Sequence, residues 1–195
     1  MTTIGVLLFD GVEELDAVGP YEVLAYWTRE HPGDGYDVLC LSEDGRPVTG
    51  AKGLVLGAHA AVPDAPPLGV LLHPGGQGTR PLMRRADHLD WIRDQRRTVP
   101  LLTSVCTGSL VYAAAGVLAG RPATTHWAAF DELLAADPTV QARPDDRWVD
   151  DGDLVTSAGV SAGIDMALHL VARLAGPERA RSVRRGIQYD PQPPV

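Results

Sequence analysis

The chain has 195 residues, of which 45% are hydrophobic and 22% charged, and its formal net charge at pH 7 is −8. This size indicates one globular domain, and the negative charge argues against nucleic acid as a main partner. No stretch approaches the roughly 20 apolar residues that a membrane-spanning helix needs. The N-terminus lacks the basic region and cleavage site of a secretory signal peptide. We therefore expect a cytoplasmic protein without membrane or nucleic-acid partners.

Two cysteines, Cys40 and Cys106, are too few for a disulfide framework, so free thiols in a reducing compartment are expected. The six histidines are scattered and form no H-x-H or H-x-x-x-H pair. The sequence therefore predicts no metal site, and we expect no cofactor.

Apolar runs and helical segments alternate along the first half of the chain. Residues 4–9 form a continuous apolar run, which is typical of a strand buried on both faces. Gly19-Pro20 is expected to open a helix that runs to about residue 28, because proline fits the first helical turn. Strands are predicted over 36–42, 53–57 and 69–76, and a helical region then reaches about residue 97.

The second half continues the alternation. Residues 99–105 are predicted to be a strand followed at once by a helix over 107–120, and 123–136 read as strand, turn and helix. A hairpin over 147–159 is expected to turn at Asp151-Gly152. A helix follows over 161–176, with Ser161 as N-cap and Gly176 as its C-terminal stop. The chain is then predicted to end in a helix over 177–187 and an extended tail.

This order of elements predicts an α/β fold. Buried strands that alternate with helices form a doubly wound, mostly parallel, flavodoxin-like sheet flanked by helices. We expect residues 1–195 to be a single domain, with 188–195 as its extended C-terminal tail. Sites in such sheets lie at the carboxyl ends of the strands. Three segments are therefore expected to converge: the loop 14–19, the "HPGGQG" loop at 73–78 and the "SVCTG" turn at 104–108.

Cys106 stands where the predicted strand turns directly into the predicted helix. A sharp strand-to-helix turn exposes the residue at its apex, as in the nucleophile elbow, and the small residues Ser104 and Gly108 flank it. The N-terminus of the helix is expected to lower the pKa of the thiol and favour the reactive thiolate. The alternative is a buried cysteine packed at a strand end, the interpretation that we prefer for Cys40 in mid-strand.

Asp16 is the candidate proton carrier. It lies among apolar neighbours in a predicted loop, where a carboxylate beside a thiol can shuttle a proton. The alternative is an ordinary capping aspartate for the helix that Pro20 opens. Glu13 and Glu14 are competing carboxylates, and their polar turn predicts that they are solvated.

The glycine-rich segment and the histidines complete the candidate site. The N–H groups of Gly75 and Gly76 are suited to stabilise developing negative charge, although most glycine-rich turns are structural, and no G-K-[ST] marks a phosphate loop. A cysteine hydrolase usually needs a histidine base, yet Thr107 follows Cys106. His126 lies further along the chain, and its alternative role is to tie down a turn.

These segments together resemble the DJ-1/PfpI superfamily, which shares its fold with class I glutamine amidotransferases. The resemblance covers nearly the whole chain, including "IGVLLFDGVEELDAVGPYEVL", "VLLHPGGQGT", "SVCTGSLVYAAAGVLAGRPATTHW", "GDLVTSAGVSAGIDMALHLV" and "QYDPQPP". Within the superfamily, Leu15-Asp16, Cys106-Thr107-Gly108 and "ATTHW" at 123–127 are most similar to the isonitrile hydratases. Those enzymes convert R–N≡C and water to an N-substituted formamide.

Departures from the other branches disfavour their activities. PfpI-type peptidases carry histidine where this chain has Thr107, and the DJ-1 branch carries glutamate where it has Asp16. Glutamine amidotransferases carry a late H-x-E pair, which the sequence lacks. The same pattern occurs in N-terminal domains of AraC-type regulators, but their helix-turn-helix domain is not expected here, because the sequence stops after "DPQPPV".

The resemblance implies a hydro-lyase that acts on a small molecule. Cys106 would attack the isonitrile carbon to give a thioimidate, with Asp16 as general acid and base. The Thr107 hydroxyl would hold Asp16 or the water, and backbone N–H groups of Gly75, Gly76 and Thr107 would face the site. Side chains expected to line an apolar pocket or contact the substrate are Leu15, Val18, His126 and Trp127.

The resemblance also implies a homodimer. The candidate interface is the apolar content of the first helix, namely Tyr21, Val23, Leu24, Tyr26 and Trp27. Two other functions stay open at this stage: a glyoxalase-like or deglycase-like cysteine chemistry on the same scaffold, and a non-catalytic ligand-binding or redox-sensing domain in which Cys106 is oxidised.

Overall fold

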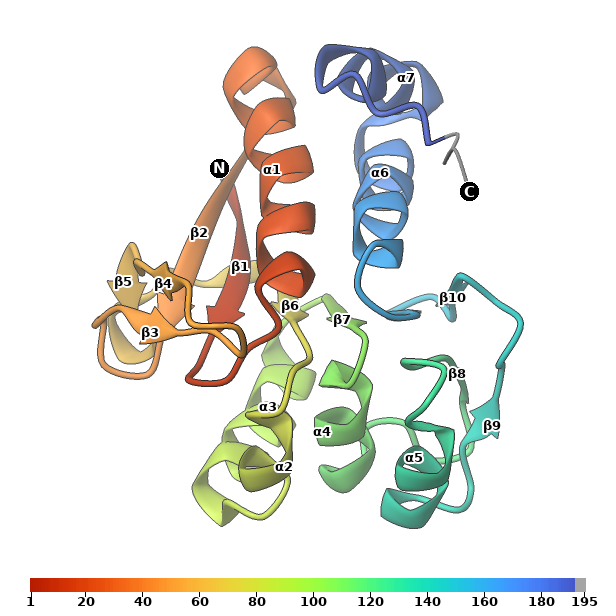
Figure 1. Ribbon diagram of the computed structural model, residues 1–195. Coiled ribbons are helices and arrows are strands. Elements are labelled where there is room, and N and C mark those ends of the chain that lie inside the picture. The colour runs from red at the N-terminus through yellow and green to blue at the C-terminus, as the bar shows by residue number, and fades with distance from the viewer. Residues whose placement is uncertain (192–195) are drawn as a thin grey trace.

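A seven-stranded sheet forms the centre of the structure, a computed structural model that describes residues 1–191 (Figure 1). The strand order is β10-β11-β7-β6-β1-β2-β5, and every neighbouring pair is parallel except β10 and β11. The strands are β1 (Thr2–Leu8), β2 (Tyr36–Ser42), β5 (Ala60–Ala61), β6 (Leu68–His73), β7 (Leu101–Val105), β10 (Trp148–Asp150) and β11 (Leu154–Ser157). The predicted mostly parallel α/β sheet and its hairpin are confirmed; part of the predicted tail, 192–195, lies outside the described residues.

Helices cover both faces of this sheet, and two hydrophobic cores result (Figure 1). One core lies beneath α1 (Glu14–Glu30), α6 (Ala162–Ala175) and α7 (Pro177–Gly186), and the other beneath α3 (Ala86–Thr98), α4 (Gly108–Ala114) and α5 (Phe130–Ala136). The remaining elements are α2 (Thr79–Leu82), the 3₁₀ turns Pro32–Asp34 and Val62–Asp64, and the short pairs β3 (Val48–Thr49) with β4 (Val55–Leu56) and β8 (Pro122–Ala123) with β9 (Gln141–Ala142). Within residues 1–191, none of the helices combines the length and apolarity that crossing a membrane requires.

The first helix starts earlier than predicted. It begins at Glu14 and carries Pro20 in its interior, where the missing N–H leaves the carbonyl of Asp16 without its helical partner. Glu14 and Asp16 occupy the first turn, where the helix dipole favours negative charge. The ring of Pro20 packs close to Gly163 of α6, where a Cβ would come within 3.1 Å of it. Asp16 therefore sits in a helical turn, and its expected placement in a loop is wrong.

The predicted dimer surface on the first helix is also wrong. Val23, Leu24 and Trp27 belong to the core beneath α1, with exposed fractions of at most 1%. Tyr21 and Tyr26 are half-buried and pack against the same core. The apolar stripe of α1 therefore faces the sheet and α6.

Two other helix ends depart from expectation. The helix after Cys106 ends at Ala114 and passes into turns, in which Gly116 adopts a positive φ of 76°. Ser161 precedes α6 as predicted, but its side chain makes no capping hydrogen bond. Gly176 does end α6, with a φ of 93°.

Candidate active site

Cys106 occupies a nucleophile elbow. It follows the last residue of β7 and has a φ of 55°, a conformation uncommon for residues other than glycine. Its N–H lies 3.1 and 3.2 Å from the carbonyl oxygens of Ser157 and Ala158, which fix the turn to β11. A Cβ on Gly108 would lie 2.1 Å from the carbonyl oxygen of His73, so this position requires glycine. The predicted strand-to-helix apex at Cys106 is therefore present.

The carboxyl group of Asp16 is buried beside this elbow, with no exposed surface. Its Oδ2 accepts a hydrogen bond from the N–H of Gly75 at 3.0 Å. Its Oδ1 has no hydrogen-bond partner among the described residues. The Cys106 thiol and the N–H of Val160 face the carboxyl closely enough to lower its pKa, although neither meets hydrogen-bond geometry. The expected pairing of Asp16 with Cys106 is therefore present in space.

Burial sets the protonation of this pair. Loss of hydration raises the pKa of Asp16 from 3.8 to about 7, against the opposing effect of the Cys106 thiol and the N–H of Gly75. Burial and, to a smaller extent, the nearby charge of Asp16 together raise the pKa of Cys106 to about 12. The N–H of Thr107 lowers it only in part.

The expected low thiol pKa is therefore wrong. The backbone N–H and the hydroxyl of Thr107, at the start of this seven-residue helix, lower the thiol pKa, but desolvation and the neighbouring carboxylate outweigh them. At neutral pH the Cys106 sulfur carries a proton, and Asp16 is close to its own midpoint. The carboxylate is thus placed to act as the base for the thiol.

The two glycines hold the site together, which differs from the predicted role. The N–H of Gly75 is taken by Asp16, and the N–H of Gly76 is taken by the Thr107 hydroxyl at 2.9 Å. Neither N–H is free to stabilise an oxyanion, whereas the N–H of Thr107 faces the Cys106 sulfur. The Thr107 hydroxyl also lies 3.2 Å from the carbonyl oxygen of Gly76 and 3.2 Å from the hydroxyl of Thr79. It therefore fastens the glycine loop and makes no hydrogen bond to Asp16, whereas its expected contact with the reacting water stays a prediction.

The predicted substrate-contacting residues are spread more widely. Trp127 is 81% exposed, so in this single chain it does not line an enclosed pocket. Leu15 and Val18, on the first turns of α1, are 37% and 38% exposed. His126 accepts a local hydrogen bond from the N–H of Ala128 at 3.2 Å, as a histidine that ties down a turn would.

Three residues near Cys106 and Asp16 were given no role of their own from the sequence, although His73 and Thr125 lie in the quoted segments 73–78 and 123–127. Val160 has a φ of 53°, an outlier for a β-branched residue, and directs its N–H toward Asp16. The hydroxyl of Thr125 donates to the carbonyl of Cys106 at 3.0 Å. His73 ends the strand before the glycine loop and is fully buried. A β-branched residue gives no sequence signal for positive φ, so Val160 could not have been found this way.

Among residues 1–191, no group of three or more His, Cys, Asp or Glu side chains is placed to hold a metal ion. The absence of a cofactor stays a prediction.

The family model described as "DJ-1/PfpI family" matches residues 2–173. An isonitrile hydratase of Pseudomonas putida is 45% identical over 192 residues, which cover 98% of this chain and 80% of that enzyme. The HTH-type transcriptional regulator CdhR of Pseudomonas aeruginosa is 34% identical over 178 residues, but the match covers 91% of this chain and 52% of the regulator. The chain thus spans about half the length of that relative.

Solved structures agree in fold. A THiJ/PfpI family protein from Pseudomonas syringae superposes with a TM-score of 0.86 at 34% identity, over all of this chain and 77% of that one. Drosophila melanogaster DJ-1beta superposes with a TM-score of 0.83 at 23% identity, over 97% of this chain and 99% of that one. The second likeness shows the fold alone.

Substitution of Gly75 tests the packing of the pair. A Cβ at Gly75 would lie 2.5 Å from the Thr107 nitrogen and 2.8 Å from Asp16 Oδ2, so Gly75→Ala must push these groups apart. We expect it to lower the free energy of unfolding by about 1–3 kcal/mol, as overpacking does, in denaturant titrations. Gly33→Ala, where a Cβ meets nothing within 4 Å, is the control and should change stability far less. Equal effects at both positions would contradict the packing described.

Asp16→Asn tests the raised pKa through stability. A carboxyl whose folded pKa exceeds its unfolded value destabilises the fold as pH rises from about 4 through 7, because ionisation is harder in the folded state. The variant should therefore gain stability over the native chain at pH 8, by up to about 4 kcal/mol, and much less at pH 4. Asp131→Asn, at an exposed position of α5, is the control for the loss of a carboxylate at the surface. A gain at pH 4 equal to that at pH 8 would refute the raised pKa.

Proposed function

This chain belongs to the DJ-1/PfpI family, and we propose that within the family it is an isonitrile hydratase, a hydro-lyase that adds water to an isonitrile carbon. The observation that carries the proposal is the buried Cys106–Asp16 pair, in which a carboxyl with a pKa of about 7 faces a protonated thiol. Thr107 follows the cysteine, so no adjoining histidine supplies a base. The 45% identity to the Pseudomonas putida isonitrile hydratase supports the same chemistry.

The first half of the reaction forms a thioimidate. Asp16 accepts the proton of the Cys106 thiol as the sulfur bonds to the terminal carbon of R–N≡C. The carbon keeps the electron pair that becomes its new C–H bond, and Asp16 returns the proton to it. The product of this half is R–N=CH–S–Cys106, and Asp16 is again a carboxylate. One proton, shared by the pair, is sufficient for the step.

The second half releases the formamide. Asp16 takes a proton from water as the water oxygen bonds to the thioimidate carbon, and the nitrogen receives that proton. The C–S bond of the resulting R–NH–CH(OH)–S–Cys106 then breaks. The hydroxyl proton passes through Asp16 to the departing sulfur, which leaves R–NH–CHO and the Cys106 thiol. Atoms and charge balance without a cofactor.

The surroundings of the pair suit this role. Gly75 holds Asp16 Oδ2, while the orphaned Oδ1 is the oxygen left to carry the proton. Thr107 contributes its N–H toward the sulfur and its hydroxyl to the glycine loop, and is a positioning residue. Leu15 and Val18 offer apolar surface for a small R group.

The alternative roles of Cys106 are less favoured by its environment. A redox sensor needs an accessible thiolate, whereas this thiol is 6% exposed and has a raised pKa.

We also propose a homodimer, in which a second copy covers the exposed Trp127, and a cytoplasmic location. Gel filtration with light scattering tests the dimer.

Turnover of p-nitrophenyl isonitrile tests the function. We expect the native chain to form the N-substituted formamide, and Cys106→Ala and Asp16→Asn to lose about 10²–10⁴-fold or more in kcat, since each removes a group from the bond-making steps. Cys40→Ala is the matched control, because Cys40 lies in β2 and takes no part in the proposed steps.

Two outcomes would overturn parts of this proposal. Turnover that survives Cys106→Ala would exclude the covalent route. No turnover by the native chain, together with lactate formation from methylglyoxal, would replace isonitrile hydration by a glyoxalase reaction.

The pH profile tests the role of Asp16 as base. Because the thiol stays protonated well above neutral pH, the active form is the one in which Asp16 is ionised. We therefore expect kcat/KM to rise with pH through a midpoint near 7 and then to level off. A profile that is flat between pH 5 and 9, or that falls as pH rises through 7, would show that Asp16 is not the base.

A further inference from the structure

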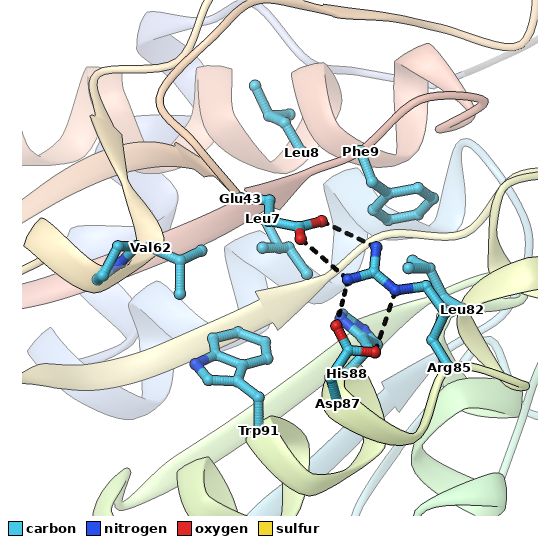
Figure 2. A pocket seen from close by; sticks show the side chains of 11 residues that line it. Leu7, Leu8, Phe9, Glu43, Val62, Leu82, Arg85, Asp87, His88 and Trp91 are labelled. Atoms are coloured by element: carbon cyan, nitrogen blue, oxygen red, sulfur yellow. Dashed lines mark hydrogen bonds and ion pairs between the residues drawn. The ribbon is translucent and has the colours of Figure 1, made fainter.

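A pair of histidines lies behind the glycine loop, outside the groups that the proposed reaction uses. His73, at the end of β6, is fully buried, and its Nδ1 lies 2.8 Å from the carbonyl oxygen of Pro74. Its Nε2 lies 3.2 Å from Nε2 of His88, on α3. His88 is half-buried and lines a cavity of about 210 Å³ together with Trp91 (Figure 2).

The protons of this pair can be assigned from its contacts. Burial lowers the pKa of His73 to about 3, so the ring is neutral at neutral pH and carries one N–H. A carbonyl oxygen only accepts hydrogen bonds, so that N–H is on Nδ1, which faces Pro74. The Nε2 of His73 is then an acceptor, and His88 must donate its own Nε2–H. His88 is neutral as well, because burial and the nearby Arg85 charge lower its pKa to about 4.

The peptide between Pro74 and Gly75 links these histidines to the site. Its carbonyl oxygen is held by His73, and its N–H is donated to Asp16 Oδ2 at 3.0 Å. The two groups belong to one rigid plane, so fixing the carbonyl also fixes the direction of the N–H. Gly75 and Gly76 follow, the latter with a φ of 119°, and glycine gives this segment conformations that other residues lack. The next peptides of the loop are fastened separately, since the carbonyl of Gly75 accepts from the N–H of Glu13 at 2.9 Å and the N–H of Gly76 donates to the Thr107 hydroxyl.

We propose that His73 and His88 are positioning residues that lock the Pro74–Gly75 peptide in the orientation that supplies Asp16 with its hydrogen bond. His88 acts on His73 by fixing its tautomer, and His73 acts on the peptide. The effect of these histidines on catalysis rests on the proposed function, whereas their effect on the hydrogen bond to Asp16 does not.

Among the described residues, the charged groups around Asp16 and around His88 do not form hydrogen bonds with the rings of the histidine pair. Besides Cys106, the charges of Glu13 and Lys52 act on the Asp16 region, and neither contacts the histidines in a hydrogen bond. Near His88, Arg85 is paired with both Glu43 and Asp87, as Figure 2 shows. A change of His88 to a neutral side chain leaves these ion pairs in place.

The ¹³C NMR titration of the Asp16 carboxyl tests the lock without any substrate. The hydrogen bond from Gly75 favours the charged form of Asp16. His88→Leu removes the donor to His73, loosens the Pro74–Gly75 peptide and weakens that bond. The midpoint of Asp16 should therefore rise, by about half a pH unit or more for partial loss of a bond to a charged group. His88→Gln keeps an N–H donor and should stay near the native midpoint. Trp91→Phe alters the same cavity without removing the donor and should leave the midpoint unchanged.

Activity adds a second readout if the proposed function holds. His88→Leu should then lower kcat several-fold with little change in KM, and its pH profile should shift upward with the Asp16 midpoint, whereas a merely structural role would lower thermal stability alone. An unchanged Asp16 midpoint in a folded His88→Leu variant would overturn the inference.

The native protein decides the matter even if His88→Leu does not fold. ¹⁵N shifts of histidine-labelled protein should show His73 protonated on Nδ1, and protonation on Nε2 would overturn the lock. If the native chain shows no isonitrile turnover but His88→Leu still shifts the Asp16 midpoint as expected, the proposed function is refuted and the positioning role of the two histidines is retained.

Discussion

The burial of one carboxyl group against one thiol is the constraint on which the site depends. Asp16 has no exposed surface, and its Oδ2 accepts a hydrogen bond from the backbone N–H of Gly75. Its pKa rises to about 7 because water is excluded, and the same exclusion keeps the Cys106 thiol protonated. The pair therefore stores one movable proton, which addition to an electron-deficient carbon requires. A fully ionised carboxylate in water would be a poorer base for a thiol of this kind, since proton transfer is most efficient when pKa values are matched to the working pH.

The fold supplies this burial through three elements that meet at one edge of the sheet. The first turn of α1 brings Asp16, the loop after β6 brings the glycines, and the elbow after β7 brings Cys106. Close approach is possible only because Gly75 and Gly108 have no side chains: a Cβ on either would come within 2.5 Å of a backbone atom. Parallel strands place their carboxyl ends at the same edge of the sheet, so the topology determines where the active site lies. The residues at that edge determine which reaction the site can catalyse.

That distinction explains what the sequence could and could not predict. Strand runs, the elbow at Cys106 and the hairpin at Asp151-Gly152 follow from local patterns, and the structure contains them. The start of α1 does not, because proline inside a helix is tolerated only when packing compensates, here against Gly163 of α6. The thiol pKa was mispredicted because a helix dipole is a local feature, whereas desolvation depends on the whole fold. The roles of Thr107 and Val160 depend on which backbone groups face them, and no sequence spacing encodes that.

The protonation state of Cys106 is the most direct test of the proposed Cys106–Asp16 pair. In a Cys40→Ala background, Cys106 is the remaining cysteine, and its thiolate can be followed by ultraviolet absorbance as pH is raised. We predict no thiolate at neutral pH and a transition only at strongly alkaline pH, which moves to lower pH when Asp16→Asn removes the neighbouring charge. A thiolate already formed at neutral pH, or a transition that ignores Asp16→Asn, would contradict this prediction.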